Sequence, residues 1–389
     1  MTRPGGFLTS SVAALVSIGC ARSAARSATY TVDTTADTVH VVNTAPSTWT
    51  GTTGWHLVLE RTIHPGAGAP EELIHPTALV ASSTGELFIL DRQPAVIKRF
   101  SADGHFLGTI GRQGSGPGEF GEYGVLYIVH DTLLVQDASQ TRATVFAPDG
   151  HFVSSWLSVP IAATEMVADD SGRVPMEAPT GTHAINSGHL VVRYHADGRI
   201  ADSVWYPAAP EPAVWHLKTA HADMGMVVPF TPDHVDAFDR AGRLISGEQN
   251  RYRLTYSSGG HHVDRLVDAP AAPVRIPDSL RTAEFTAATT RSAWLAGVAH
   301  LDDIPRDYPV WTAIVADGAN NLWVLRPGPA GDGDHWDVFG ADGHLLGAAE
   351  APFHHADHTF WTRDHVYVLQ DADDGTPAVM VYRIDRGGA

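Results

Sequence analysis

Residues 85–120 read GELFILDRQPAVIKRFSADGHFLGTIGRQGSGPGEF, and this stretch decides the fold. Its glycine-rich end, from Gly111 to Phe120, has two interpretations: a phosphate-binding loop or part of a repeated architecture. A phosphate-binding loop requires either a helix directly after the glycines or a Gly-Lys-Ser/Thr ending. The chain has neither, because residues 121–137 read as two short strands separated by a His-Asp break. The sequence therefore favours a repeat over a nucleotide site.

A short pattern recurs along the chain: an aromatic residue, two further residues, Asp-Gly, and shortly afterwards an apolar pair. Apolar residues alternate with polar ones on both sides of the pattern, which is typical of β-strands. The Asp-Gly step supplies the positive φ angle that a tight hairpin turn needs. Each copy therefore predicts a β-hairpin. The copies are FSADGHFL from Phe100, FAPDGHFV from Phe146, YHADGRIA from Tyr194, FGADGHLL from Phe339 and the degenerate YSSGGHHV from Tyr256.

A further pair of strands precedes the hairpin in the best copies, as in HPTALVASSTGELFILDR from His75. Each unit is then four antiparallel strands over about 40 to 50 residues, which is the length of one β-propeller blade. We therefore predict an all-β fold, a six-bladed β-propeller. The blades are expected at residues 76–110, 124–156, 164–204 and 234–267, with the fifth beginning near 308 and the sixth near 358.

The sixth unit ends one strand short, and a matching strand lies near the N-terminus. Trp55–Ile63 (WHLVLERTI) has strand composition and is followed by HPGAGAPEEL, which repeats the register of GRQGSGPGEF. Counted from the last strand residue, Glu72 falls at the offset of Glu119, and Leu73 at that of Phe120. We therefore predict that the N-terminal strand is the outer strand of blade six, where it pairs an edge that would otherwise be exposed.

The beginning of the chain resembles a targeting signal. Arg3 is followed by an apolar run too short to span a bilayer, which ends at Cys20, the only cysteine. Ile18-Gly19-Cys20 resembles the lipobox of bacterial lipoproteins, so we expect lipidation of Cys20. The alternative is a plain secretory signal with an incidental cysteine. A single cysteine excludes an intrachain disulfide.

We expect three parts: a signal at 1–20, a tether at 21–53 with one strand near Thr38–Val42, and the propeller at 54–386. Either kind of signal places the mature chain outside the cytoplasm, in the periplasm or at the cell surface, and only the lipid anchor would contact the membrane. The formal net charge of -18 argues against a nucleic-acid partner, since phosphate binding needs a basic surface. We expect a monomer.

The stretch from Gly85 to Phe120 resembles the NHL repeat of six-bladed propellers. The matching features are a strand ending in Asp91, an aromatic-ending strand, Asp103-Gly104 and the glycine-rich connector. The whole layout is also similar to uncharacterised bacterial propeller lipoproteins. This resemblance implies a fold and no activity, because the architecture hosts peptide-binding sensors, amidating lyases, lactonases and strictosidine synthase-like proteins.

Metal ligands are the first candidates for a site. PFHHADHTF contains His354, His355, Asp357 and His358, and imidazole and carboxylate groups bind zinc and similar ions. Alternate residues of a strand-like connector point in opposite directions, so we expect His354 and His358 to converge while His355 points away. The candidate set is therefore His354, Asp357 and His358. The alternative is a solvated connector in a His-rich chain.

Two acid-rich segments suggest calcium, residues 331–339 and 371–375, but neither has the full spacing of a calcium loop. Both lie where hairpin turns are expected, and such turns favour Asp and Gly in any case. Zn or Ca is therefore a possible cofactor, and none is firmly indicated. The chain has no Gly-x-Ser-x-Gly motif, and we assign no catalytic residue.

The segment from Ile276 to Tyr308 breaks the strand rhythm between blades four and five. PDSLRTAEF fits a helix that begins at Pro277, with Glu284 in reach of Arg281. Such an insertion caps the channel, docks a partner, or simply packs against the ring. A second long connector, from Tyr206, is expected on the same rim.

These observations favour a binding or scaffolding module outside the cytoplasm. Its ligand, a protein, peptide or small molecule, is expected at the channel mouth or at the rim loops. The alternative is a metal-dependent hydrolase or lyase with its site in the propeller channel.

Overall fold

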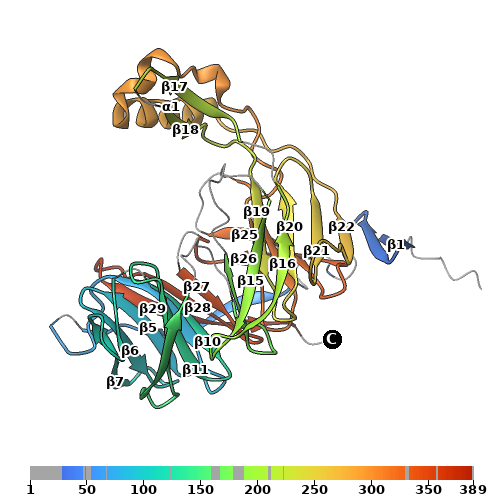
Figure 1. Cartoon of the computed structure of the whole chain (residues 1–389). Coiled ribbons are helices and arrows are strands. Elements are labelled where there is room, and N and C mark those ends of the chain that lie inside the picture. Colours follow the sequence, from blue (N-terminus) through green and yellow to red (C-terminus); the bar gives the residue numbers. More distant parts are fainter. Residues whose placement is uncertain are drawn as a thin grey trace, which may run out of the picture.

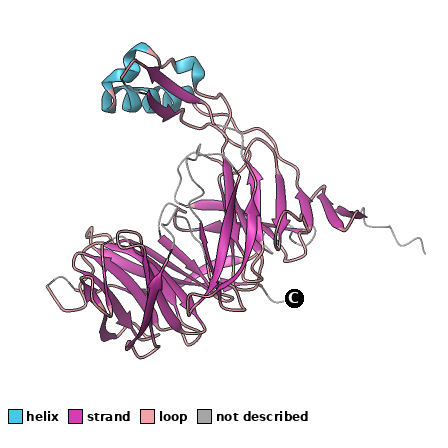
Figure 2. Ribbon diagram, viewed as in Figure 1, coloured by secondary structure: helices cyan, strands magenta, loops and turns pink. Residues whose placement is uncertain are grey.

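The computed structural model describes residues 29–46, 49, 54–66, 68–122, 124–158, 167–177, 188–208, 212–221, 223–328, 333–355 and 358–387. These residues form a six-bladed β-propeller with one helical insertion, as the sequence predicts (Figures 1 and 2). In each complete blade, four antiparallel strands run from the central channel outward in chain order. Blade six takes its outer strand from the N-terminal part of the chain.

The strands of blades one to three are β4 (Pro76–Ala81), β5 (Leu87–Arg92), β6 (Ala95–Phe100) and β7 (Phe106–Ile110); β10 (Gly124–Val129), β11 (Thr132–Asp137), β12 (Arg142–Phe146) and β13 (Phe152–Leu157); and β14 (Arg173–Glu177), β15 (His189–His195) and β16 (Ile200–Tyr206). Those of blades four to six are β19 (His234–Phe238), β20 (Leu244–Glu248), β21 (Arg253–Ser257) and β22 (Arg265–Asp268); β23 (Ala313–Ala316), β24 (Leu322–Leu325), β25 (Asp334–Phe339) and β26 (Leu345–Ala351); and β27 (His358–Trp361), β28 (His365–Asp371), β29 (Pro377–Asp385) and β3 (His56–Ile63).

Hydrophobic packing between blades holds the ring together. One buried cluster joins blade one to blades two and six, a second joins blades two, three and four, a third joins blades four and five, and a fourth joins blades five and six. Each blade thus buries both of its faces against neighbours, which is why its middle strands read as near-continuous apolar runs. In β5, for example, every residue except the last is buried.

The closing strand, β3, lies where the sequence predicts. It pairs antiparallel with β29, from Ile63 opposite Val379 to His56 opposite Asp385. Glu60 on β3 accepts a hydrogen bond from Arg383 Nε at 3.0 Å and pairs with His365 of β28. Ile63 belongs to the cluster around blade one, whereas Leu57 packs against the cluster of blades five and six. The closing strand therefore contributes to two interfaces at once.

The glycine of the repeated Asp-Gly step has two functions. Gly104 has a φ of 88°, as a tight hairpin turn requires. A Cβ atom at Gly104 would also lie 2.9 Å from Cγ1 of Ile63, on the outer strand of the preceding blade. The same close approach recurs in three other blades, at Gly150 against Ile110, Gly198 against Trp156 and Gly343 against Val267. The glycine therefore shapes the hairpin and also lets neighbouring blades meet.

We expect Gly104→Ala to destabilise the protein more than Gly375→Ala. Gly375 also has a positive φ, 77°, but nothing lies within 4 Å of its Cβ position. Gly375→Ala should therefore cost only the left-handed backbone strain, about 1 to 2 kcal/mol. Gly104→Ala adds the overlap with Ile63, worth a further 1 to 3 kcal/mol or so. Urea unfolding of both variants measures the difference, and equal losses would refute the role of the close approach.

The glycine-rich stretch is a connector between blades one and two. Within it, β8 (Arg112–Gln113) pairs in parallel with β9 (Glu119–Phe120). Glu119 accepts hydrogen bonds from the Gly116 backbone N–H at 2.7 Å and from Arg112 Nε at 2.8 Å, and these bonds lower the pKa of its carboxyl. The first copy has a matching bond, from the Gly68 N–H to Glu72.

The apolar residue at the end of the connector is buried in both copies, Leu73 in one and Phe120 in the other. The register that linked the two connectors in the sequence is therefore confirmed.

The segment predicted as a tether contains an ordered hairpin. It is formed by β1 (Tyr30–Thr35) and β2 (Thr38–Asn43), which contains the strand predicted near Thr38–Val42. β2 pairs in parallel with β22 and extends the sheet of blade four to six strands. Asn43 reaches blade five, where it donates to the Gly343 carbonyl and accepts from the Leu345 N–H. The ordered part of the tether thus bridges two blades.

The two irregular connectors fold together. We call the result the rim module: β17 (Val214–Lys218), β18 (Asp223–Val227), the helix α1 (Asp278–Arg291) and the 3₁₀ turns η2 (Ala293–Gly297) and η3 (Leu301–Asp303). They share a separate core that contains Trp215, Ala288 and Leu295. Trp215 Nε1 donates to Asp303 at 2.8 Å. The rim module stands away from the ring, and the helices of the described chain lie in it (Figure 2).

The contacts of α1 correct two expectations. The helix packs against the β17–β18 hairpin, whereas the sequence left open that it packs against the ring. Arg281 does not pair with Glu284. Its buried guanidinium instead binds Asp278 and donates to the carbonyls of Leu301 and Ile304, which begin and follow the 3₁₀ turn η3.

Candidate binding site at the channel mouth

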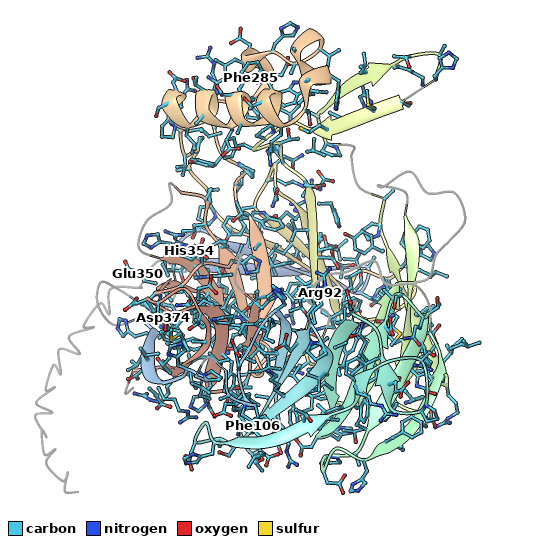
Figure 3. All side chains as sticks on the ribbon, turned by 90° about the vertical axis from the view of Figure 1, so that its left-hand side faces the viewer. Arg92, Phe106, Phe285, Glu350, His354 and Asp374 are labelled. Carbon is cyan, nitrogen blue, oxygen red and sulfur yellow. The ribbon has the colours of Figure 1, made fainter. Side chains whose placement is uncertain are left out.

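The propeller has two different faces. On the turn face, each inner strand turns into the second strand of its blade; on the connector face, each outer strand leads to the inner strand of the next blade. Both parts of the rim module replace connectors, so the module stands over the connector face. Phe106 is the first residue of β7 and follows a hairpin turn on the turn face. In Figure 3, Phe106 and Phe285 of the rim module accordingly lie at opposite ends of the molecule.

The central channel holds a cavity of about 400 Å³. The innermost strands of the blades line it, mainly with apolar side chains such as Leu79, Leu126, Phe238 and Ile314. The same residues also belong to the buried clusters between blades, which explains why the inner strands are apolar on both sides.

A larger cavity of about 810 Å³, the mouth cavity, opens on the turn face. It shares four lining residues with the channel cavity, Ile128, Ala168, Arg240 and Phe360, so the two spaces adjoin. Its rim is made by the turns between the first and second strands of the blades.

The role of a residue at the mouth depends on its position in the turn. The first residue of the turn is structural in three blades: Asp169, Asp239 and Asp317 are buried and accept hydrogen bonds from backbone N–H groups of their own turns. The second residue of the turn lines the mouth cavity in all six blades. These residues are Ser83, Asp131, Asp170, Arg240, Gly318 and Arg363.

Arg240 lies between the mouth and the channel. It follows β19 in blade four, yet its Nη1 donates to the Ala168 carbonyl of blade three at 3.0 Å, and its Nη2 to the Trp361 carbonyl of blade six at 3.3 Å. Its guanidinium carbon is 5.3 Å from the ring centre of Phe360. Burial lowers the pKa of Arg240, while Asp170 and Asp317 raise it. The side chain therefore spans the axis of the propeller.

Most carboxylates around the mouth have partners. Asp131 accepts from the N–H and hydroxyl of Ser83, both at 2.8 Å, and so joins blades one and two. Asp169 is bound to Arg173, and Asp364 to Arg386 at 2.8 Å. Burial raises the pKa of Asp317 even though Asn321 donates to it.

The predicted metal set is only partly described. His354 pairs with Asp334, Nδ1 to Oδ1 at 3.1 Å (Figure 3). His358 lines the channel cavity together with His355, so His355 does not point away from it as the sequence predicts. His358 also lines a cavity of about 560 Å³ on the connector face. Asp357 lies outside the described residues. Among the residues that are described, no group of three His, Cys, Asp or Glu side chains is placed to hold a metal ion, so the set stays a prediction.

The acid-rich segments proposed for calcium contain structural contacts, and residues 334–339 of the first form the strand β25 where the sequence predicts a turn. Asp337 is buried, accepts from the Tyr252 hydroxyl at 2.9 Å and pairs with Arg326. Asp374 accepts from the Thr376 hydroxyl. Cys20, the predicted lipidation site, lies outside the described residues. No helix in the described part of the chain is long and apolar enough to cross a membrane.

Sequence reasoning missed Arg240 and the mouth cavity. The available signal was the alignment of the turns themselves, where the second position varies from Ser to Asp, Gly and Arg while the first is Asp in three blades and Ser, His or Thr in the others. That signal required the blades to be placed around one axis before the six positions could be seen to converge.

Comparison with known proteins shows the fold. No family model matches the chain, and no curated protein matches it significantly. Among solved structures, the chain is similar to a protein of Bacteroides fragilis inferred to be exported, with a TM-score of 0.50 and 11% identity over 87% of this chain and 98% of that chain.

Two enzymes of known structure are also similar to the chain. They are a PQQ-bound aldose sugar dehydrogenase of Streptomyces coelicolor, with a TM-score of 0.45 and 15% identity over 88% of this chain and 100% of that chain, and virginiamycin B lyase of Staphylococcus aureus, with 0.41 and 11% over 84% and 99%. At such low identity the likeness extends to the architecture alone.

Proposed function

We propose that this protein is a ligand-binding module whose site is the mouth cavity. The observation that carries the proposal is that the second position of the inner turn lines the cavity in all six blades, while a buried Asp at the first position fixes the turn in three of them. A rigid ring with variable residues at one mouth is the arrangement in which loops on a scaffold carry binding.

We also propose that the domain is related to NHL-repeat propellers and is displayed outside the cytoplasm on a lipidated Cys20. The first strand begins at Tyr30, only about ten residues after Cys20. An extended chain spans at most about 3.6 Å per residue, so the anchor would lie within roughly 35 Å of blade four. Mass spectrometry of the mature N-terminus tests this, because an unmodified Cys20 would contradict it.

A bulky side chain at the mouth should weaken ligand binding. Ala102 lines the mouth cavity, so Ala102→Trp narrows it, whereas Leu107→Trp adds the same ring on an exposed outer strand. We expect any organic acid, monosaccharide, amino acid or short peptide that raises the melting temperature of the wild type to stabilise Leu107→Trp equally and Ala102→Trp much less. Equal stabilisation of both variants would place the site elsewhere, for example on the rim module.

The alternative is metal-dependent hydrolysis or elimination in the channel. His355 and His358 both line the channel cavity, and this observation favours it. Elemental analysis of the purified protein separates the two proposals. Stoichiometric zinc or calcium that is lost in His358→Ala would support the enzyme, whereas a folded, metal-free protein that still binds ligands at the mouth would support the binding module.

A further inference from the structure

Three arginines converge on the mouth cavity from different parts of the ring. Arg61 lies on the closing strand β3, Arg240 on the turn of blade four, and Arg363 on the turn of blade six. The chain as a whole is strongly acidic, with 44 Asp and Glu against 26 Lys and Arg. Three guanidinium groups therefore meet at one cavity of an acidic protein, among lining aspartates that include Asp131 and Asp170.

These arginines have no carboxylate partner within 4.0 Å among the described residues, although Arg99 and Arg243 elsewhere in the ring do have one. The Nε of Arg61 is buried without a hydrogen-bond partner in the described part of the chain. Arg240 donates to two carbonyl oxygens, and its guanidinium carbon lies 5.3 Å from the ring centre of Phe360. The side chain of Arg363 is exposed at the mouth.

The acids of the mouth offset part of this positive charge. Asp169 and Asp364 are already paired with Arg173 and Arg386. Asp131 accepts hydrogen bonds from the neutral Ser83 and so keeps its charge, and Asp170 and Asp317 act on Arg240 electrostatically. A guanidinium stays protonated at any pH at which the protein is folded, so it must find an anion, a π face or water.

Resting on the function proposed above, we infer that the mouth cavity binds a small organic oxyanion, a carboxylate or phosphate group held by Arg61, Arg240 and Arg363. The planar fork of each guanidinium matches the two oxygens of such a group. The partly buried position of Arg240 strengthens the attraction, because fewer water molecules screen it. Ile128 and Phe360, which line both cavities, offer an apolar surface to the rest of the ligand.

Titration calorimetry of the intact protein with citrate and with inorganic phosphate tests the inference. We expect at least one of them to bind, citrate if the site prefers carboxylates and phosphate if it prefers phosphate esters, and we expect added salt to weaken the binding. Arg61→Gln and Arg363→Gln should each weaken it about tenfold or more, since each removes a charge-assisted hydrogen bond. Arg240→Lys, which keeps the charge but loses the fork, should also weaken it.

Arg112→Gln is the matched control, because Arg112 is exposed, lies on the connector between two blades and is absent from the mouth cavity. It should leave the affinity unchanged. If neither anion binds, or if binding is indifferent to Arg61→Gln and Arg363→Gln, the oxyanion inference is wrong. If a neutral ligand nevertheless binds and its binding is weakened by Ala102→Trp, the proposed binding function survives without it.

Discussion

A chain lacking residues 55–63 is expected to lose about 5 kcal/mol or more of unfolding free energy, which is comparable with the whole stability of many domains. The deletion removes β3, the outer strand of blade six, and so exposes the edge of β29. It also removes Ile63, which packs into the cluster of blade one, and Leu57, which packs against blades five and six. The ring would then open at one interface and unfold at lower denaturant.

Deleting residues 30–43 is the control for this experiment. That hairpin extends blade four but completes no blade, so its loss should shift the urea midpoint far less. A synthetic peptide with the sequence of residues 54–65 should partly restore the midpoint of the first deletion. An unchanged midpoint after removal of residues 55–63 would show that the ring does not depend on its closing strand.

Arg193→Met is expected to cost about 3 kcal/mol, the lower end of the range for breaking a buried ion pair. The side chain is 2% exposed and binds Asp202 within blade three. It also donates to the carbonyls of Gly242 and Ser258 in blade four. Methionine fills a similar volume but leaves these carbonyls without their donor. Asp202 keeps its second partner, Arg173, which limits the loss.

Arg199→Met is the matched control, because Arg199 pairs with Asp197 in the same blade but is 75% exposed. An exposed pair of this kind contributes about 0 to 1 kcal/mol. Urea unfolding of the two variants should therefore give clearly separated midpoints. Similar midpoints would mean that the contacts of Arg193 between blades three and four contribute little to stability.

The parts of the fold that depend on local chemistry were predictable. The Asp-Gly turns mark hairpins because the positive φ is a property of two or three residues, and the closing strand could be found because its connector repeats the register of the connector after Ile110. The second function of Gly104 was not predictable, since Ile63 lies on another blade.

The rim module and the mouth cavity were beyond the sequence for a similar reason. Trp215 and Leu295 lie in separate insertions, and no periodicity in either segment indicates that the two pack together. Arg240 is an ordinary turn residue in the sequence, and it became a site candidate only because its side chain reaches carbonyls in blades three and six. Contacts between distant segments decide both features, and a single sequence does not encode them in any local pattern.

The closing strand also determines when the ring can finish folding. Glu60 and Arg383, which meet across it, are 323 residues apart along the chain. The strand β3, which is synthesised early, must therefore wait for β29, which is synthesised late. Bringing the two together has a large entropic cost and makes folding correspondingly slow. During that wait, the same strand can complete the last blade of a neighbouring copy, so domain-swapped oligomers are the misassembly product that this topology invites at high concentration.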